Sequence, residues 1–210
     1  MKVLIASHNM GKVTEFKKIL NNLGFEFMTL NDFHEVEEPE ETGLTLNENS
    51  LIKAKYYFDL FKIPVIADDT GLFIEDLNGE PGINAARYSG YGDKENRKLV
   101  LQKLNGKMSN AYFETVLTFY DGANVVTANG IMEGKIALKE SGEHGFGYDS
   151  IFYSPVYGKT MAELGVDIKN QISHRFNATI NLKRKLEFLQ DSQKEIEYIK
   201  NQFKNNLNEE

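Results

Sequence analysis

The chain has 210 residues, 41% of them hydrophobic and 26% charged, which is typical of one globular domain and not of a disordered chain. Its 24 Lys and Arg against 31 Asp and Glu give a formal net charge of −7, which disfavours nucleic-acid and anionic-membrane partners. The sequence contains no cysteine, so disulfides, thiolate catalysis and Cys-ligated metal sites are excluded. No apolar run reaches the length of a membrane span and the N-terminus has no signal-peptide pattern, so we expect a cytoplasmic protein.

The first part of the sequence has the strand–helix–strand order of an α/β domain. A continuous apolar run, Val3–Ala6, predicts a strand that is buried on both faces. An amphipathic helix follows and is predicted to end at Gly24, a residue typical of helix C-caps. A second strand is predicted over 25–30, and the acidic segment 31–42 is predicted to be a solvated loop or part of a site.

Thr45 and Glu48 have the spacing of a capping box, which predicts a helix that continues to about Phe61. The next apolar run, Pro64–Ala67, predicts a short buried strand that ends where two aspartates begin.

The second half of the chain is predicted to contain further helices and strands. We expect a helix over 93–104, an antiparallel pair of strands over 112–120 and 125–138, a glycine-rich loop over 142–149, and a last amphipathic helix over 172–189. The fold class is therefore mixed α/β, a sheet flanked by helices.

We assign residues 1–190 to a single domain in two lobes and residues 191–210 to a polar helical extension. The extension has apolar residues at heptad-like spacings. Two interpretations remain open. It is either a fraying polar terminus, or a continuation of the last helix that packs on its own domain or on a dimer partner through Ile196, Ile199 and Phe203.

Ser7, Asn9 and Lys12 lie between the first strand and the first helix. Free N–H groups and the positive end of the helix dipole make such a junction a natural anion site. Lys12 opposes the dipole, which is unfavourable unless an anion lies there. In the alternative interpretation Asn9 or Ser7 is an ordinary N-cap and Lys12 a surface lysine.

Asp68 and Asp69 directly follow a buried strand, at the edge where α/β folds place ligands. Adjacent carboxylates repel each other unless a cation or protons compensate their charge. With a further carboxylate from Glu41, such an oxygen-only set favours Mg²⁺ or Mn²⁺ over zinc. The alternative is an ordinary loop start with an Asx turn.

Two motifs in the C-terminal half also suggest a ligand. In the segment 145–149, glycines flank Phe146 and would let the backbone approach a planar ligand while the ring stacks on it. Lys169, His174 and Arg175 place cations near the start of the last helix, where the dipole opposes them without an anion or carbonyl partner. The alternatives are a core aromatic in a turn and a structural histidine.

Taken together, these stretches resemble the inosine triphosphate pyrophosphatase family, which removes non-canonical purine nucleoside triphosphates. The matching segments fall in order over about residues 2 to 189 and comprise 7–12, 41–45, 48–49, 53–54, 67–72, 81–82, 86–88, 145–149 and 172–175.

The resemblance implies an elongated two-lobed α/β fold with a central active-site cleft, usually a homodimer. It also implies hydrolysis of ITP, dITP or XTP to the monophosphate and pyrophosphate by attack of water at the α-phosphorus. Mg²⁺ would be held by Glu41 and Asp69 with Asp68 close by, and Asp69 would accept the proton of the attacking water. The implied substrate-binding residues are Ser7, His8, Asn9, Met10, Gly11, Lys12, Lys53, Thr70, Phe146, Gly147, Tyr148, Asp149, Lys169, His174 and Arg175.

Two other functions fit the same residues less well. One is a septum-associated type of nucleotide pyrophosphatase with a different base preference, and the other is a catalytically silent nucleotide-binding module. A panel of nucleoside triphosphates assayed for pyrophosphate release separates all three.

Overall fold

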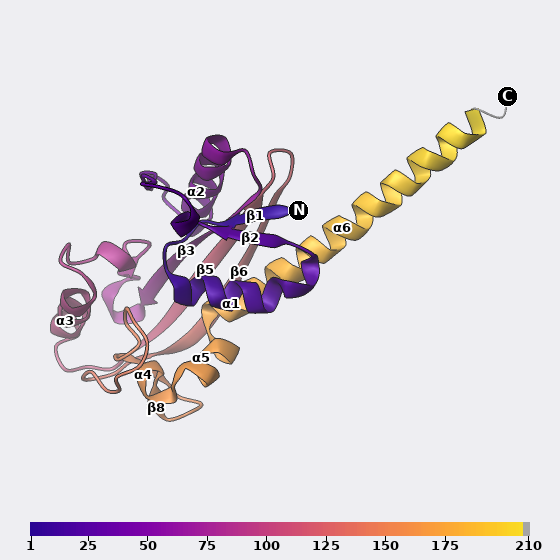
Figure 1. The fold of residues 1–210 in the computed structure, drawn as a ribbon. Coiled ribbons are helices and arrows are strands. Elements are labelled where there is room, and N and C mark those ends of the chain that lie inside the picture. Colours follow the sequence, from indigo (N-terminus) through magenta and orange to yellow (C-terminus); the bar gives the residue numbers. More distant parts are fainter. Residues whose placement is uncertain (208–210) are drawn as a thin grey trace.

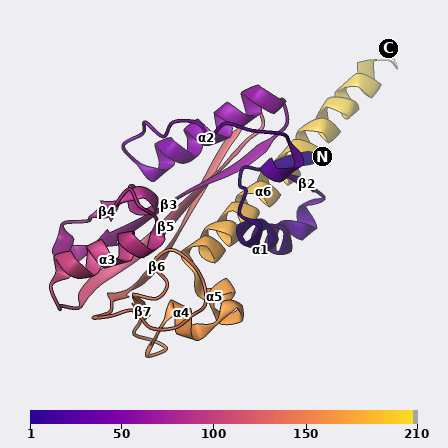
Figure 2. The same cartoon turned by 60° about the vertical axis from the view of Figure 1, so that its left-hand side comes forward.

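The computed structural model describes residues 1–207, and their side chains except those of Val166 and 202–207. A mixed sheet is flanked by helices (Figures 1 and 2). The strands are β1 (Lys2–Ile5), β2 (Glu26–Thr29), β3 (Val65–Ile74), β4 (Pro81–Gly82), β5 (Ser109–Tyr120), β6 (Val125–Ile136), β7 (Phe152–Ser154) and β8 (Lys159–Thr160). The α-helices are α1 (Met10–Leu20), α2 (Leu46–Phe61), α3 (Asp93–Leu104), α4 (Met161–Leu164), α5 (Val166–Ile172) and α6 (His174–Leu207). Short 3₁₀ turns are η1 (Asn21–Leu23), η2 (Leu30–Asp32), η3 (Glu75–Leu77) and η4 (Ala85–Arg87).

The strand order is β2-β1-β3-β5-β6-β7-β8, with β4 paired to β3. β1 runs parallel to β2 and to the start of β3, and all other pairs are antiparallel. The predicted mixed α/β class is confirmed, as are the helix over 93–104 and the antiparallel pair of long strands. Gly24 takes up a left-handed conformation (φ 67°) just after η1, as a C-cap glycine does.

The strand expected to end at Ala67 is longer than predicted. β3 continues through Asp68 and Asp69 to Ile74, because β5 pairs with it along its whole length. The predicted end of this strand at the aspartates is therefore wrong, and so is the alternative in which they start a loop with an Asx turn. β1 stops at Ile5, opposite Ile66, so the aspartates lie just beyond the end of the parallel pairing, inside the continuing antiparallel sheet.

The sheet has two faces, which we name after the helices that cover them (Figure 2). On the α2 face, Leu4, Val65 and Ala67 pack with Ala54 and Tyr57 of α2. On the α6 face, apolar side chains from α1, α6 and the sheet form a second core, which comprises Val3, Ile5, Val13, Phe16, Leu20, Leu23, Ile66, Leu117, Phe119, Ala128, Ala178, Leu182 and Leu186. A third core lies at the far end of the sheet, around Val100 and Leu104 of α3 and Phe152 of β7.

Helix α6 crosses β6 at close range. Asn177, Asn181 and Lys185, four residues apart, donate to the carbonyls of residues 131, 129 and 127 at 2.7–3.0 Å. Side chains of α6 thus satisfy alternate carbonyls along the strand. A Cβ at Gly130 would lie 2.1 Å from the Ala178 nitrogen, so only glycine permits this approach.

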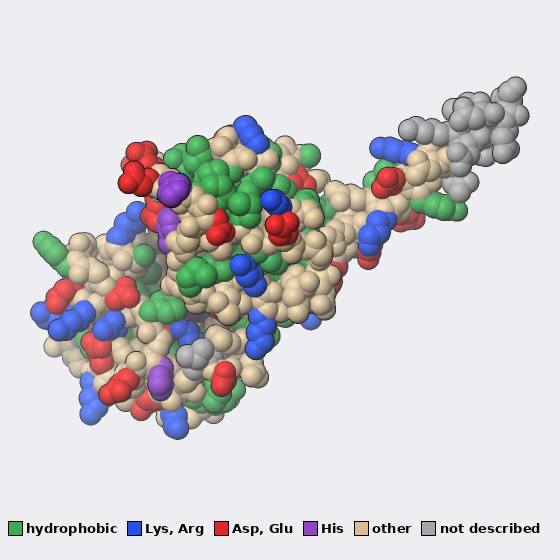
Figure 3. Space-filling model, viewed as in Figure 1, with side chains coloured by type: hydrophobic (Ala, Val, Ile, Leu, Met, Phe, Trp, Pro, Cys, Tyr) green, Lys and Arg blue, Asp and Glu red, His purple; other side chains and the backbone are tan. Residues whose placement is uncertain are grey.

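The last helix is longer than the predicted 172–189, and residues 174–207 form one continuous helix. Its C-terminal part projects away from the rest of the molecule (Figure 1), and polar and apolar side chains are mixed along it (Figure 3). Ile196 and Ile199 are about half exposed, so they do not pack on their own domain. Contact of these residues with a partner stays a prediction, and the side chain of Phe203 lies outside the described residues.

Within residues 1–207, no helix combines the length and the apolar character that crossing a membrane requires.

Gly130→Ala should lower the free energy of unfolding by about 2–3 kcal/mol, because the added methyl meets backbone on α6 and forces the helix off the sheet. Urea unfolding measures the change. Glu133→Ala, on an exposed position of the same strand, is the matched control and should change little. Equal stability of Gly130→Ala and the wild type would contradict the close helix–strand packing.

Candidate active site

The N-terminus of α1 forms one end of the site. The Asn9 Oδ1 accepts hydrogen bonds from the backbone N–H of Gly11 (2.9 Å) and of Lys12 (3.2 Å), so Asn9 is the N-cap. The Ser7 Oγ accepts from the Asn9 N–H at 3.1 Å. Lys12, however, is not a surface lysine, because its Nζ donates to the Asp68 Oδ2 at 2.8 Å.

Asp68 and Asp69 point to opposite faces of the sheet, because successive side chains of a strand alternate. Asp68 lies on the α6 face, where Lys12 of α1 binds it and the Arg175 Nε of α6 lies 4.0 Å from its Oδ2. Asp69 lies on the α2 face, where the Lys53 Nζ donates to its Oδ1 at 3.2 Å. Each carboxylate therefore has its own cations, and this relieves the repulsion expected between adjacent aspartates.

The two aspartates differ in proton affinity. Burial raises the pKa of Asp68, but Lys12, Arg175 and Lys53 outweigh burial and hold this pKa well below its usual range. For Asp69 burial dominates over the attraction of Lys53, and its pKa is raised. The Asp69 Oδ2 is buried and makes no hydrogen bond among the described residues, so one carboxylate oxygen is left for a ligand.

Glu41 joins the α2 side of the site. Its Oε1 lies 2.8 Å from the Lys53 Nζ, so that one ammonium group bridges Glu41 and Asp69. Arg87 of η4 pairs with the other oxygen of Glu41. Arg87 is not among the residues predicted for the site, although it lies in one of the segments that carry the resemblance.

A cleft of about 450 Å³ lies over these groups. Among the predicted residues, Ser7, His8, Asn9, Lys12, Glu41, Lys53, Asp68, Asp69 and Thr70 line it, together with Arg87. The Thr70 hydroxyl forms a hydrogen bond of 2.7 Å with that of Thr115, across β3 and β5.

The two residues on either side of Asn9 are also predicted to bind substrate. His8 and Met10 are exposed, and both contact the side chain of Asn31, His8 through its Nδ1 at 2.9 Å and Met10 through its Sδ at 3.2 Å. Met10 does not line the cleft. Its prediction as a substrate-binding residue is therefore not supported by its position.

The segment 142–149, which we call the base loop because the resemblance assigns it to the purine base, lies between β6 and β7. Inside it, the Asp149 Oδ2 accepts from the Phe146 N–H at 2.9 Å, and Lys169 of α5 forms a short ion pair with Asp149. A Cβ on Gly145 would lie 2.1 Å from the same Oδ2, which makes this glycine necessary. The loop thereby holds the Phe146 ring at 47% exposure, with the Lys169 Nζ 4.3 Å and the Arg175 Cζ 5.8 Å from its centroid.

Other predicted residues of the base loop hold the loop instead of presenting a free group. Tyr148 is buried, and its hydroxyl donates to the Ala85 carbonyl at 2.7 Å. Both the ring and the hydroxyl of Tyr148 are thus occupied within the protein, and its part in binding a purine stays a prediction. Gly147 is bonded through its backbone to α3.

His174 and Arg175, at the start of α6, connect the two ends of the site. The His174 ring stacks on Phe113 with the centroids 4.6 Å apart. Burial, and then the nearby Arg175, lower the pKa of His174 well below its usual value, so the ring is neutral near pH 7. The His174 Nδ1 and the Arg175 Nε are buried without hydrogen-bond partners among the described residues.

Glu15 of α1 is a further residue of the site, which stands with Ser7, Asn9 and Lys12 in the sequence but has no role assigned to it there. Its Oε2 lies 3.9 Å from an Arg175 nitrogen, and its Oε1 accepts from the Ser173 hydroxyl at 3.3 Å. Burial raises the pKa of Glu15 more than Arg175 lowers it. The only sequence signal is its spacing from Lys12, which puts both on one side of α1.

The model of the Ham1 family matches residues 3–185. The chain is 42% identical over 195 residues to a protein of Mannheimia succiniciproducens named dITP/XTP pyrophosphatase, covering 88% of this chain and 98% of that one. It is 41% identical to a protein of the same name from a Thermoanaerobacter species, covering 87% and 95%.

Two solved structures are also similar. A HAM1 protein from Coxiella burnetii has a TM-score of 0.82 at 35% identity, and the Ham1 protein of Staphylococcus aureus has 0.81 at 38%. Both comparisons cover 89% of this chain and 98% of the other chain.

Lys12→Met should destabilise the protein by about 1.5–3 kcal/mol at pH 7, because it removes a hydrogen bond between charged groups at a buried carboxylate. Since the folded-state pKa of Asp68 is depressed, its stabilisation exists above the unfolded-state pKa of about 3.9 and is lost as the pH falls below it.

The stability difference between wild type and Lys12→Met should therefore shrink as the pH falls through and below about 4. Urea unfolding at pH 7 and at acidic pH, without divalent cations, tests this. Lys17→Met, at an exposed position of the same helix, is the control. A difference independent of pH would contradict the assigned pairing.

Proposed function

Because the chain belongs to the Ham1 family, we propose that it is a nucleoside triphosphate pyrophosphatase, a hydrolase acting on acid anhydrides. Its substrates would be the non-canonical purine nucleotides ITP, dITP and XTP, which it converts to the monophosphate and pyrophosphate. The names of the relatives support the reaction class. The observation that carries the proposal is the pair of buried aspartates with separate cation partners, which line a cleft of about 450 Å³ together with Lys12, Lys53 and Arg87.

The triphosphate binds in the cleft. The N-terminus of α1 faces it with the positive end of a helix dipole, and Lys12, Lys53 and Arg87 add full positive charges. All three cations are paired with carboxylates in the structure described, so they are already placed at the cleft surface. These charges would stabilise the negative charge that develops on the leaving pyrophosphate.

We also propose that Mg²⁺ is required and that Glu41 and Asp69 hold it. The Lys53 ammonium lies between these carboxylates, and the Asp69 Oδ2 is a buried oxygen without a partner, so the donor set suits a hard cation. The described residues contain no group of three or more His, Asp or Glu that could hold a metal. This fits Mg²⁺, which proteins commonly hold through one or two carboxylates together with substrate phosphates. When bound, Mg²⁺ would supply charge stabilisation at the phosphates and make water a better acid.

Asp69 would accept the proton of the water that attacks the α-phosphorus. Its carboxylate lines the cleft, where it could accept a hydrogen bond from a water bound there. Asp68 has a different role, because its Oδ2 pairs with Lys12 and Arg175. It would keep Lys12 in place beside the phosphates and Arg175 in place near the base.

The base would lie against Phe146, within reach of His174 and Arg175. Both residues have a buried nitrogen that lacks a hydrogen-bond partner, and Arg175 donates only. A 6-oxo group accepts a hydrogen bond from the Arg175 guanidinium, and from His174 in the tautomer that carries its proton on Nδ1, whereas the amino group of adenine leaves these donors unpaired. This asymmetry would favour ITP and XTP over ATP.

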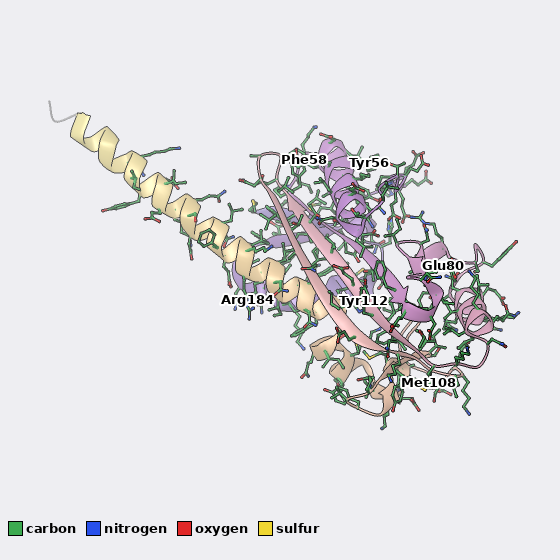
Figure 4. All side chains as sticks on the ribbon, turned by 180° about the vertical axis from the view of Figure 1, so that it is seen from behind. Tyr56, Phe58, Glu80, Met108, Tyr112 and Arg184 are labelled. Carbon is green, nitrogen blue, oxygen red and sulfur yellow. The ribbon has the colours of Figure 1, made fainter. Side chains whose placement is uncertain are left out.

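We further propose that the protein acts as a homodimer in the cytoplasm. Beyond the N-terminal end of α2, no helix within residues 1–207 covers the α2 face of the sheet around Tyr112, as Figure 4 shows from behind. There the Phe73 and Tyr112 rings stack 4.9 Å apart and line two adjoining hollows, of about 530 and 680 Å³. Such an uncovered aromatic face suits a second copy of the chain.

Asp69→Asn should reduce pyrophosphate release from ITP by at least about 100-fold, because it removes the proton acceptor and a negative charge at little change in volume. The variant should keep its far-UV circular dichroism. Asp59→Asn, on the exposed side of α2, is the control. Near-normal turnover of Asp69→Asn would refute this assignment.

His174→Ala and Arg175→Ala should each reduce the preference for ITP over ATP by about 1–3 kcal/mol, the value of a hydrogen bond lost from a buried donor. The ratio of kcat/KM for ITP and ATP is the measurement. An unchanged ratio in both folded variants would mean that other groups read the base.

A further inference from the structure

Two side chains of helix α3 bind the backbone N–H and the backbone carbonyl of one residue in the base loop, Gly147. The Gly147 N–H donates to the Asp93 Oδ2 at 2.9 Å, and the Arg97 Nη1 donates to the Gly147 carbonyl at 2.8 Å. Asp93 and Arg97 are four residues apart on α3, so they lie on one side of the helix and act on the same residue. We call these two hydrogen bonds the α3 clamp.

The guanidinium of Arg97 is itself fixed. Its Nε donates to the Glu140 Oε2 at 2.9 Å, and the Ser150 hydroxyl donates to the same oxygen at 2.9 Å. Glu140 and Ser150 flank the base loop in sequence, so Arg97 is tied to both ends of the loop as well as to Gly147. The Arg97 side chain is only 18% exposed, which reduces competition from water.

The α3 clamp acts next to the residue assigned to the purine. Gly147 has a φ of 60°, a conformation open to glycine, and follows Phe146 directly. The Phe146 ring is about half exposed, so its position depends strongly on its backbone. With its own N–H bonded to Asp149 and the next residue held by α3, the backbone on both sides of this ring is fixed.

The same helix also holds the segment that carries Arg87. The buried Asn96 Nδ2 donates to the carbonyls of Ala85 (3.4 Å) and Ala86 (3.0 Å). Arg87 follows directly and pairs with Glu41 in the cleft. Helix α3 therefore connects the base loop to the phosphate end of the site as one rigid support.

We propose that Asp93 and Arg97 are positioning residues for purine selection, because they hold the Phe146 ring where the base must stack. The inference rests on the proposed function, which assigns Phe146 to the purine. Without the α3 clamp the loop would sample other positions, and binding would then cost more free energy because the loop must be ordered again. The chemistry at Asp69, on the far side of the sheet, would be unaffected.

Kinetics of Arg97→Met test the inference, because methionine keeps the apolar stem and removes both hydrogen bonds. We expect the KM for ITP to rise on the order of tenfold with kcat nearly unchanged. Asp93→Ala should behave alike, whereas Asp93→Asn retains an acceptor oxygen and should be close to wild type. Lys98→Met, which removes a surface pair with Glu95 on the same helix, is the matched control. An unchanged KM in Arg97→Met, or an equal rise of the KM in Lys98→Met, would overturn the inference.

A second measurement separates this inference from the proposed function. The chain has no tryptophan, so Phe146→Trp introduces a single tryptophan at the base loop, whose emission can be excited selectively beside the 10 tyrosines. Adding Arg97→Met in that background should increase acrylamide quenching and lower anisotropy at temperatures well below the Tm of both variants, while Lys98→Met should not. Unchanged quenching would refute the α3 clamp even in an active enzyme. Failure of the wild type to hydrolyse ITP would refute the proposed function and leave the quenching result valid.

Discussion

The alternation of side chains along β3 is the constraint on which the site depends. Two adjacent aspartates in a loop would compete for the same ions, but in a strand they face opposite sides of the sheet. Asp68 then meets Lys12 and Arg175 on the α6 face, and Asp69 meets Lys53 on the α2 face. The sequence of β3 thus separates two carboxylates that are neighbours in the chain into two environments with opposite pKa shifts.

Helices α1, α2 and α6 are placed so that each brings a cationic side chain to one of these carboxylates. Helix α1 begins where β1 ends and reaches Asp68 with Lys12 from its first turn. Helix α6 reaches the same aspartate with Arg175, because Gly130 lets it lie directly against β6. Packing of the core and geometry of the site are therefore one arrangement, because the same helices that cover the sheet bring Lys12 and Arg175 to Asp68.

Much of this could be predicted from sequence, because the signals are local. Caps and apolar periodicity located α1, α2 and α3, and Lys12 drew attention because the dipole of α1 opposes its charge. The face to which each aspartate points could not be predicted, since the extent of β3 is set by its pairing with β5. The contacts of Glu15 and the burial of Tyr148 also depend on partners distant in sequence. The length of α6 was one of two open alternatives, because a half-exposed helix gives a weak apolar signal.

The most direct test of the division between the two aspartates is calorimetric titration of Mg²⁺ into the protein with a non-hydrolysable ITP analogue. Asp68→Asn and Asp69→Asn are to be compared under the same conditions. If the faces of the sheet separate their tasks, Asp69→Asn loses Mg²⁺ binding while Asp68→Asn retains it and binds the nucleotide with altered affinity. Equal loss of Mg²⁺ binding in both variants would contradict the account.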